Sequence, residues 1–99
     1  MMKKITKTRR IRNLAVIKYE DPGHGWYKLD RKILNALNLQ NEISTFSYER
    51  GNSVYLEEDC DGSKVLDALF MKGVEVRVIT KTTNKSSKIR SYDRYKVRQ

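Results

Sequence analysis

Basic side chains are concentrated at the two ends of this chain, which leaves a short central stretch to build a hydrophobic core. Residues 1–13 carry six Lys or Arg and no acid, and residues 81–99 carry seven Lys or Arg and one acid. The stretch 14–80 holds eight basic side chains and eleven acids. A core made from about 65 to 70 residues is close to the lower limit for unaided folding. We therefore expect one compact domain at 14–80, between a basic N-terminal arm (1–13) and a basic, Tyr-containing C-terminal arm (81–99).

The apolar pattern of the central stretch predicts an α+β domain with the element order β-β-α-β-β-α-β. Short segments rich in β-branched and aromatic residues predict strands at 13–20, 26–29, 42–48, 53–58 and 74–80. Asp30 can cap a helix that runs from Arg31 to about Asn41, and a second helix from Ser63 to Lys72 is expected to stop at Gly73. We expect a single antiparallel-rich sheet with these two short helices on one face.

Several classes of protein are disfavoured by what the sequence lacks. Cys60 is the one cysteine, which rules out an internal disulfide and a multi-cysteine zinc site and suits a reducing cytoplasm. No apolar signal core follows the basic start, and the longest apolar run, Leu14–Ile17, is too short to span a bilayer. No Walker loop, dinucleotide fingerprint, HExxH, paired CxxC or RNP1 pattern occurs. We expect a cytoplasmic, non-enzymatic protein with no cofactor, no metal site and no membrane attachment.

The segment DPGHGW is the first candidate site, because glycines on both sides of His24 precede Trp26. Glycine lets the backbone approach a ligand closely, and an indole offers a large contact area, so this loop can recognise a partner. The competing interpretation is a hairpin turn whose Trp26 folds back into the core while His24 is solvated. A catalytic His24 would need an orienting acid, and Asp21 is the local one.

Four acids form the second candidate site, namely Glu57, Glu58, Asp59 and Asp61. This acidic cluster can dock a basic partner, or it can cap the helix that begins at Ser63 and interact with its positive end. Its spacing follows the first half of an EF-hand loop, but the twelfth position would be Ala68 where a bidentate Glu is required. We therefore expect no calcium site of this kind.

The two basic ends are candidate nucleic-acid contacts, because Lys and Arg neutralise phosphates and tyrosine rings stack on unpaired bases. The C-terminal candidates are Lys88, Arg90, Tyr92, Arg94, Tyr95 and Lys96, and the N-terminal candidates are Lys3, Lys4, Arg9, Arg10 and Arg12. In the alternative interpretation, apolar residues of the C-terminal end pin it against the sheet and its cations form an ordinary solvated face. Those apolar residues are Ile89, Tyr92, Tyr95 and Val97.

The strings DPGHGW, VYLEEDCD and SKIRSY together resemble a group of small uncharacterised proteins of bacteriophages and related mobile elements. The resemblance covers roughly residues 17 to 95 and implies a location in the host-cell cytoplasm. It also implies two functions. The first is an accessory protein that binds nucleic acid or a nucleoprotein complex through the basic arms. The second is an inhibitor that binds a host protein through the His24–Trp26 loop and the Glu57–Asp61 acids. The oligomeric state stays open.

Overall fold

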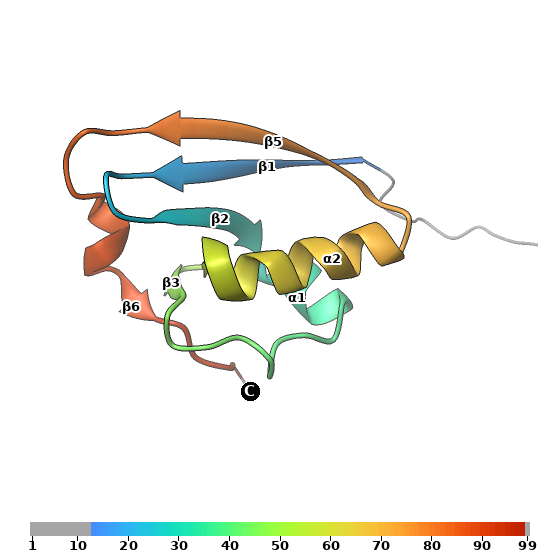
Figure 1. The fold of residues 1–99 in the computed structure, drawn as a ribbon. Helices are drawn as coiled ribbons and strands as arrows, with labels where there is room; N and C mark the ends of the chain where they lie inside the picture. Colours follow the sequence, from blue (N-terminus) through green and yellow to red (C-terminus); the bar gives the residue numbers. More distant parts are fainter. Residues whose placement is uncertain (1–12, 99) are drawn as a thin grey trace, which may run out of the picture.

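A six-stranded mixed sheet runs through the molecule in the strand order β5-β1-β2-β4-β3-β6 (Figure 1). The structure is a computed structural model that describes residues 13–98. β1 pairs in parallel with β5, and the other neighbouring pairs are antiparallel. The strands are β1 (Asn13–Glu20), β2 (Gly25–Asp30), β3 (Tyr48–Arg50), β4 (Ser53–Glu57), β5 (Glu75–Thr82) and β6 (Asp93–Arg94). The predicted α+β class is confirmed.

Two α-helices, α1 (Arg31–Ala36) and α2 (Ser63–Met71), accompany the sheet. As predicted, the Asp30 side chain caps α1, accepting a hydrogen bond from the Lys32 N–H at 2.8 Å. α2 follows a short π-helical segment, η2 (Glu58–Gly62), and links β4 to β5 across β2 and β1. No helix among residues 13–98 is long and apolar enough to cross a membrane.

Both helices end where the backbone enters the left-handed region. Gly73, with φ of +79°, ends α2, and the Val74 N–H reaches back to the Leu69 carbonyl at 3.0 Å. This Schellman motif is the predicted stop. Asn38, with φ of +61°, ends α1 in the same way, and the Leu39 N–H donates to the Leu34 carbonyl at 3.2 Å. The expected extension of this helix to Asn41 is therefore wrong, because Asn38 closes the helix first.

The main core lies between the sheet and the helices. The alternation of each strand turns one set of side chains toward α1 and α2, which contribute Leu34, Val65 and Leu69 to the same buried cluster. The strand residues of this cluster are Val16, Leu29, Val54 and Leu56. Val65 and Leu69 thus form the buried face of α2.

The expected strand at 42–48 is largely absent, because β3 begins only at Tyr48. The buried carboxylate of Asp61 holds the preceding residues in a turn instead. One of its oxygens accepts hydrogen bonds from the Ser44 N–H, the Ser44 hydroxyl and the Ser47 hydroxyl at 3.0, 2.7 and 2.5 Å. A regular strand cannot direct Ser44 and Ser47 at one point, since residues three apart face opposite sides. The path of the chain before Tyr48 is therefore set by a contact that is distant in sequence.

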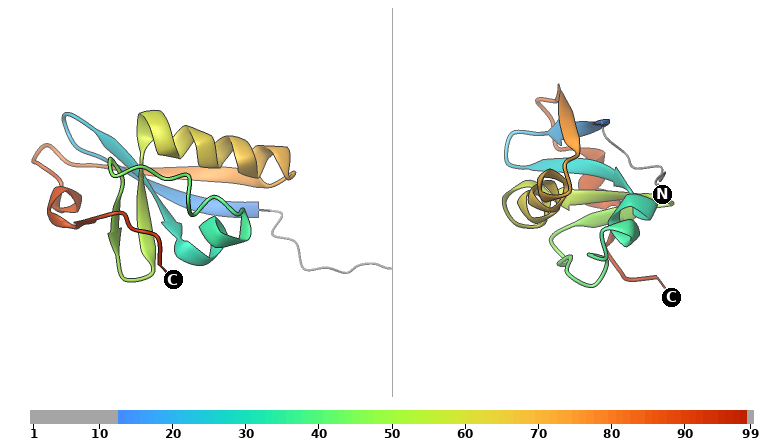
Figure 2. Two further views of the ribbon diagram at one scale, coloured as in Figure 1. Left: turned by 90° about the horizontal axis from the view of Figure 1, so that it is seen from below. Right: turned by 90° about the vertical axis from the view of Figure 1, so that its right-hand side faces the viewer.

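The C-terminal segment is built into this body through residue 98. β5 extends to Thr82, a 3₁₀ turn, η3 (Lys88–Ser91), follows, and β6 pairs with β3. Ile89 and Tyr95 are each 3 % exposed. η3 lies on the side of the sheet opposite α2, where Ile89 packs against Trp26, Tyr48 and Tyr55 (Figure 2). Ile89 and Tyr95, with the half-buried Tyr92, therefore pack as in the alternative interpretation of the C-terminal end, whereas Val97 is 39 % exposed and does not.

Candidate functional site

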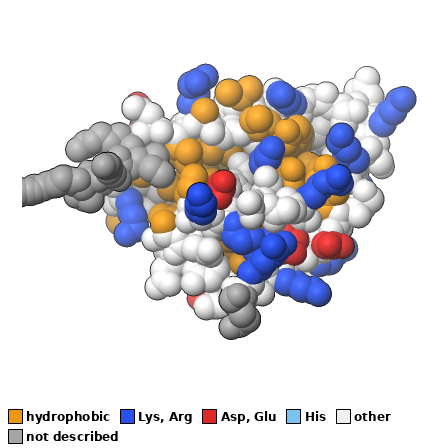
Figure 3. Space-filling model, turned by 180° about the vertical axis from the view of Figure 1, so that it is seen from behind, with side chains coloured by type: hydrophobic (Ala, Val, Ile, Leu, Met, Phe, Trp, Pro, Cys, Tyr) orange, Lys and Arg blue, Asp and Glu red, His pale blue; other side chains and the backbone are white. Residues whose placement is uncertain are grey.

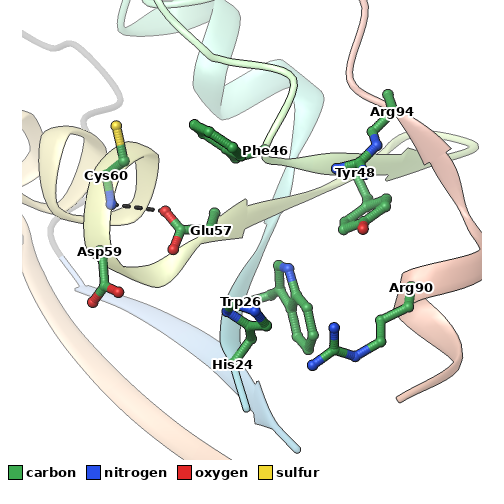
Figure 4. A pocket seen from close by; sticks show the side chains of 9 residues that line it. All are labelled: His24, Trp26, Phe46, Tyr48, Glu57, Asp59, Cys60, Arg90 and Arg94. Carbon is green, nitrogen blue, oxygen red and sulfur yellow. Dashed lines mark hydrogen bonds between the residues drawn. The ribbon is translucent and has the colours of Figure 1, made fainter. Parts of the chain in front are cut away.

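A shallow pocket of about 520 Å³ opens at one end of the sheet, on the face that α2 leaves free (Figure 4). It draws side chains from the β1–β2 loop, the turn before β3, the β4–η2 junction and the C-terminal segment. The lining residues are His24, Trp26, Phe46, Tyr48, Glu57, Asp59, Cys60, Arg90 and Arg94. The pocket thus joins residues predicted for protein binding with two predicted for nucleic acid.

Two adjacent rings lie between two guanidinium groups along one wall of this pocket. The Arg90 guanidinium lies 5.4 Å from the centre of the Trp26 ring, and Tyr48 meets Trp26 edge-on at 6.2 Å between centroids. Arg94 lies 4.7 Å from the centre of the Tyr48 ring and donates to the Thr45 carbonyl at 3.0 Å. Such cation–π contacts orient the two arginines.

Asp21 attaches the DPGHGW loop to the C-terminal segment. Its fully buried carboxylate accepts two hydrogen bonds from Arg90, at 2.6 and 2.9 Å. The same carboxylate accepts from the backbone N–H groups of Gly23, His24 and Ser87. Arg90, followed by these backbone donors, holds the pKa of Asp21 well below its usual range against the opposing effect of burial. The predicted phosphate contact of Arg90 therefore competes with a structural ion pair.

The predicted recognition loop divides into one buried and one exposed residue. Trp26 is 2 % exposed and forms the pocket wall, whereas His24 lies exposed with its ring 6.0 Å from the indole. Asp21 contacts the backbone of His24 rather than its imidazole. Among the described residues, no carboxylate hydrogen-bonds to the His24 ring.

The four predicted acids have separate surroundings. Glu57 accepts from the Cys60 N–H at 2.9 Å and caps η2, while Asp59 is exposed beside it in the pocket wall. Glu58 pairs with Lys18 at 2.7 Å and, together with Glu20, raises the pKa of that lysine. We expected Asp61 to contact a partner, but this prediction is wrong, because Asp61 is fully buried. Glu57 thus caps η2, whereas α2, which begins at Ser63, lacks the side-chain cap that the acids predict. The acids do not act as one group.

A strip of tyrosines and cations occupies the same face beyond the pocket, across β1 to β5 and Tyr92 of the C-terminal segment. Tyr55 lies 6.2 Å from Tyr19 and 5.1 Å from Tyr92 between ring centroids. The Arg50 guanidinium lies 5.0 Å from the centre of the Tyr92 ring. Lys28 is opposite Tyr55 in the sheet register, and Lys81 is opposite Tyr19. We call these six residues the tyrosine strip.

The face that carries the tyrosine strip is mainly apolar and basic (Figure 3). Its hydrophobic side chains are interspersed with Lys and Arg, and acidic side chains are few in this view. Tyr19, Tyr92 and Lys28 are half-buried, Tyr55 is buried, and Arg50 and Lys81 are exposed. Aromatic and cationic groups are therefore presented side by side on one surface.

The remaining predicted nucleic-acid residues differ in accessibility. Lys88 and Lys96 are exposed, and Lys96 also uses its backbone to bind Glu49 and Arg31. Tyr95 is buried in the main core, and its hydroxyl donates to the Gln40 carbonyl at 2.6 Å. The prediction that its ring stacks on a base is therefore wrong. The N-terminal candidates lie outside the described residues; they are Lys3, Lys4, Arg9, Arg10 and Arg12.

Sequence reasoning missed the residues that connect the predicted ones. In the pocket these are Phe46, Tyr48 and Cys60, and in the tyrosine strip they are Tyr19, Lys28, Arg50, Tyr55 and Lys81. The two-residue period did contain a signal, since Tyr19 and Tyr55 lie out of phase with the buried Val16 and Val54. Strand order, which brings the tyrosines together, has no such local signal.

Among residues 13–98, no three His, Cys, Asp or Glu side chains are grouped so that they could hold a metal ion. Comparison of the chain with protein-family models, with curated proteins and with solved structures found no match. The pocket and the tyrosine strip are therefore the two features of the molecule that indicate a function.

Proposed function

We propose that this protein binds single-stranded nucleic acid on the tyrosine strip. The observation that carries the proposal is the placement of the half-buried Tyr19 and Tyr92 on either side of the buried Tyr55, with Arg50 over the Tyr92 ring. Bases that are not paired can stack on tyrosine rings or on a guanidinium plane, and adjacent cations can bind the phosphates. Lys28, opposite Tyr55 on the neighbouring strand, would supply such a phosphate contact.

The basic N-terminus has a different part in this proposal. Residues 1–13 carry six cations and no acid, which is suited to attracting any polyanion through a salt-sensitive field. We expect this segment to raise affinity for single and double strands alike. The tyrosine strip would supply the preference for the single strand, because a duplex keeps its bases stacked on one another.

The test is fluorescence anisotropy with a labelled oligo-uridine or oligo-thymidine of about 12 nucleotides and a duplex of equal length, titrated with the full chain. We expect tighter binding to the single strands and a steep loss of affinity between about 50 and 200 mM salt. Tyr92→Ala should weaken single-strand binding roughly tenfold, while Tyr92→Phe, which keeps the ring, should retain it.

Two further variants distinguish binding by the tyrosine strip from non-specific attraction by the net positive charge. Lys28→Ala removes a strip cation, and Lys32→Ala removes an equal charge from an exposed position on α1. We expect Lys28→Ala to lower the affinity for single strands more than Lys32→Ala does, because both remove one positive charge but only Lys28 lies in the strip. Equal affinity for single and double strands, or an unchanged affinity of Tyr92→Ala, would refute the proposal. Replacing Arg9, Arg10 and Arg12 with Gln should lower affinity for both forms and reduce the salt slope by about three.

A second candidate function, binding of a host protein, is favoured by Phe46. This side chain is 66 % exposed at the pocket, whose lining also includes the exposed His24 and Asp59. An exposed ring that is bordered by polar groups is a common anchor of a protein interface.

The test of this second function is capture from host lysate after nuclease treatment. A stoichiometric partner that is retained by the wild type and lost on Phe46→Ala would support this function. Trp26 is unsuitable for this purpose because it is buried.

A further inference from the structure

β5 forms one edge of the sheet, and its outer side pairs with no strand among residues 13–98. It is eight residues long, and its last six residues are all exposed. Val78 and Ile79 at its centre are 42 % and 38 % exposed, and Phe70 and Met71 at the end of α2 are exposed shortly before the strand begins. A long edge with apolar side chains is a template for pairing with another strand.

The hydrogen bonds of β5 show which backbone groups face outward. The Thr83 N–H donates to the Glu20 carbonyl at 2.9 Å, so it continues the ladder toward β1. Backbone groups of successive strand residues point to opposite sides. The N–H and C=O groups of the even-numbered residues therefore point to the free side, and these residues are Val76, Val78, Thr80 and Thr82.

The charges of β5 select one antiparallel register for pairing with an identical strand. Outward-facing residues must oppose outward-facing residues, so the register can shift only in steps that keep even numbers paired with even numbers. When Val78 opposes itself, Glu75 opposes Lys81 of the second copy, and this ion pair occurs twice by symmetry. The neighbouring registers place Arg77 opposite Lys81 or opposite itself, and like charges in those positions are destabilising.

We propose that this protein forms a twofold-symmetric dimer through antiparallel pairing of β5 with β5 of a second copy, centred on Val78. The two sheets then form one continuous sheet. Val78 meets its counterpart on the helix side, and on the other side Arg77 opposes Ile79 while Glu75 pairs with Lys81. Such an isologous contact closes the exposed edge and cannot extend into a fibre.

The register is tested by charge reversal in the full chain, with sedimentation velocity over a range of protein concentrations. Glu75→Lys or Lys81→Glu alone places like charges opposite each other twice, and we expect each to weaken the dimer about tenfold or more. The double variant restores both pairs and should recover the wild-type dimer. Asp67→Lys, at an exposed position of α2, makes the same charge change as Glu75→Lys away from β5 and serves as the control.

The backbone pairing is tested separately by Thr80→Pro. The N–H at this position faces outward, so proline leaves the ladder to β1 intact and removes a donor of the proposed interface. We expect a folded monomer, with a circular dichroism spectrum like that of the wild type. A wild-type protein that stays monomeric at millimolar concentration would overturn the proposal. So would a dimer that is unaffected by Thr80→Pro and by both single reversals.

Discussion

Asp61 shows how one buried side chain can determine the path of a distant loop. Its carboxylate is the common acceptor for Ser44 and Ser47, and the Ser47 hydroxyl in turn accepts from the Glu57 N–H at 2.9 Å. Asp61→Ala would leave both hydroxyls without their charged acceptor. We expect it to lower the free energy of unfolding by about 3 kcal/mol. Asp59→Ala, the exposed neighbour, should change it by less than about 0.5 kcal/mol. Urea denaturation of both variants is the measurement, and equal midpoints would contradict the role of Asp61.

The ion pair between Asp21 and Arg90 predicts a dependence of stability on pH. Because folding lowers the pKa of Asp21, its contribution is present above the unfolded pKa of about 3.9 and is lost as pH falls below it. Glu49 acts in the same direction. Burial would raise its pKa, but the Lys96 N–H and Arg31 more than compensate.

We expect Asp21→Asn to be less stable than the wild type at pH 7 and to lose less stability on acidification. The measurement is the urea midpoint at pH values from about 7 down to about 3. The slope that remains in the variant should include the contribution of Glu49. Asp59→Asn is the matched control, because this carboxylate is exposed. A variant with the full wild-type slope would show that Asp21 does not carry the effect.

At the scale of the element, local patterns predict the structure where local forces decide it. The hairpin of β1 and β2, the cap at Asp30 and the stop at Gly73 are set by residues adjacent in sequence. The strand expected at 42–48 was wrong because a carboxylate more than a dozen residues away decides the conformation there. The end of α1 was missed for a smaller reason, since Asn38 can take the left-handed conformation that glycine more often supplies.

The faces of α2 give a prediction with a control on the same helix. Leu69 is 3 % exposed within the main core, whereas Phe70 beside it is 77 % exposed. Leu69→Ala should lower the free energy of unfolding by roughly 2 to 5 kcal/mol, because it removes buried apolar volume. Phe70→Ala should change it by less than about 0.5 kcal/mol. Chemical denaturation measures both, and a larger effect at Phe70 would mean that α2 is rotated relative to the sheet.

At the scale of the whole molecule, charge and packing divide the chain differently. The basic C-terminal stretch begins at 81, yet the fold continues through Ile89 and Tyr95, whose side chains are buried. Formal charge along a sequence therefore locates cations but does not show which are free, since Arg90 is paired and Arg94 is stacked. The tyrosine strip depends on the tertiary fold, which brings Tyr19 and Tyr92, although they are distant in sequence, to either side of Tyr55.

The two proposals together make a prediction that neither makes alone. A twofold axis that pairs two β5 edges is perpendicular to the sheet, so both tyrosine strips would lie on the same side of the dimer. A single strand long enough to reach both strips would then gain from linked binding, whereas a short one would occupy one strip.

We expect an oligonucleotide of about 24 nucleotides to bind the wild type at least tenfold more tightly than one of about 8, beyond the statistical gain from its greater number of sites. Thr80→Pro should remove this advantage and leave the affinity for the short strand unchanged, because each monomer keeps its own strip. Tyr92→Ala should weaken both. If Thr80→Pro weakened short and long strands equally, β5 itself would belong to the nucleic-acid contact and the dimer would not explain the length dependence.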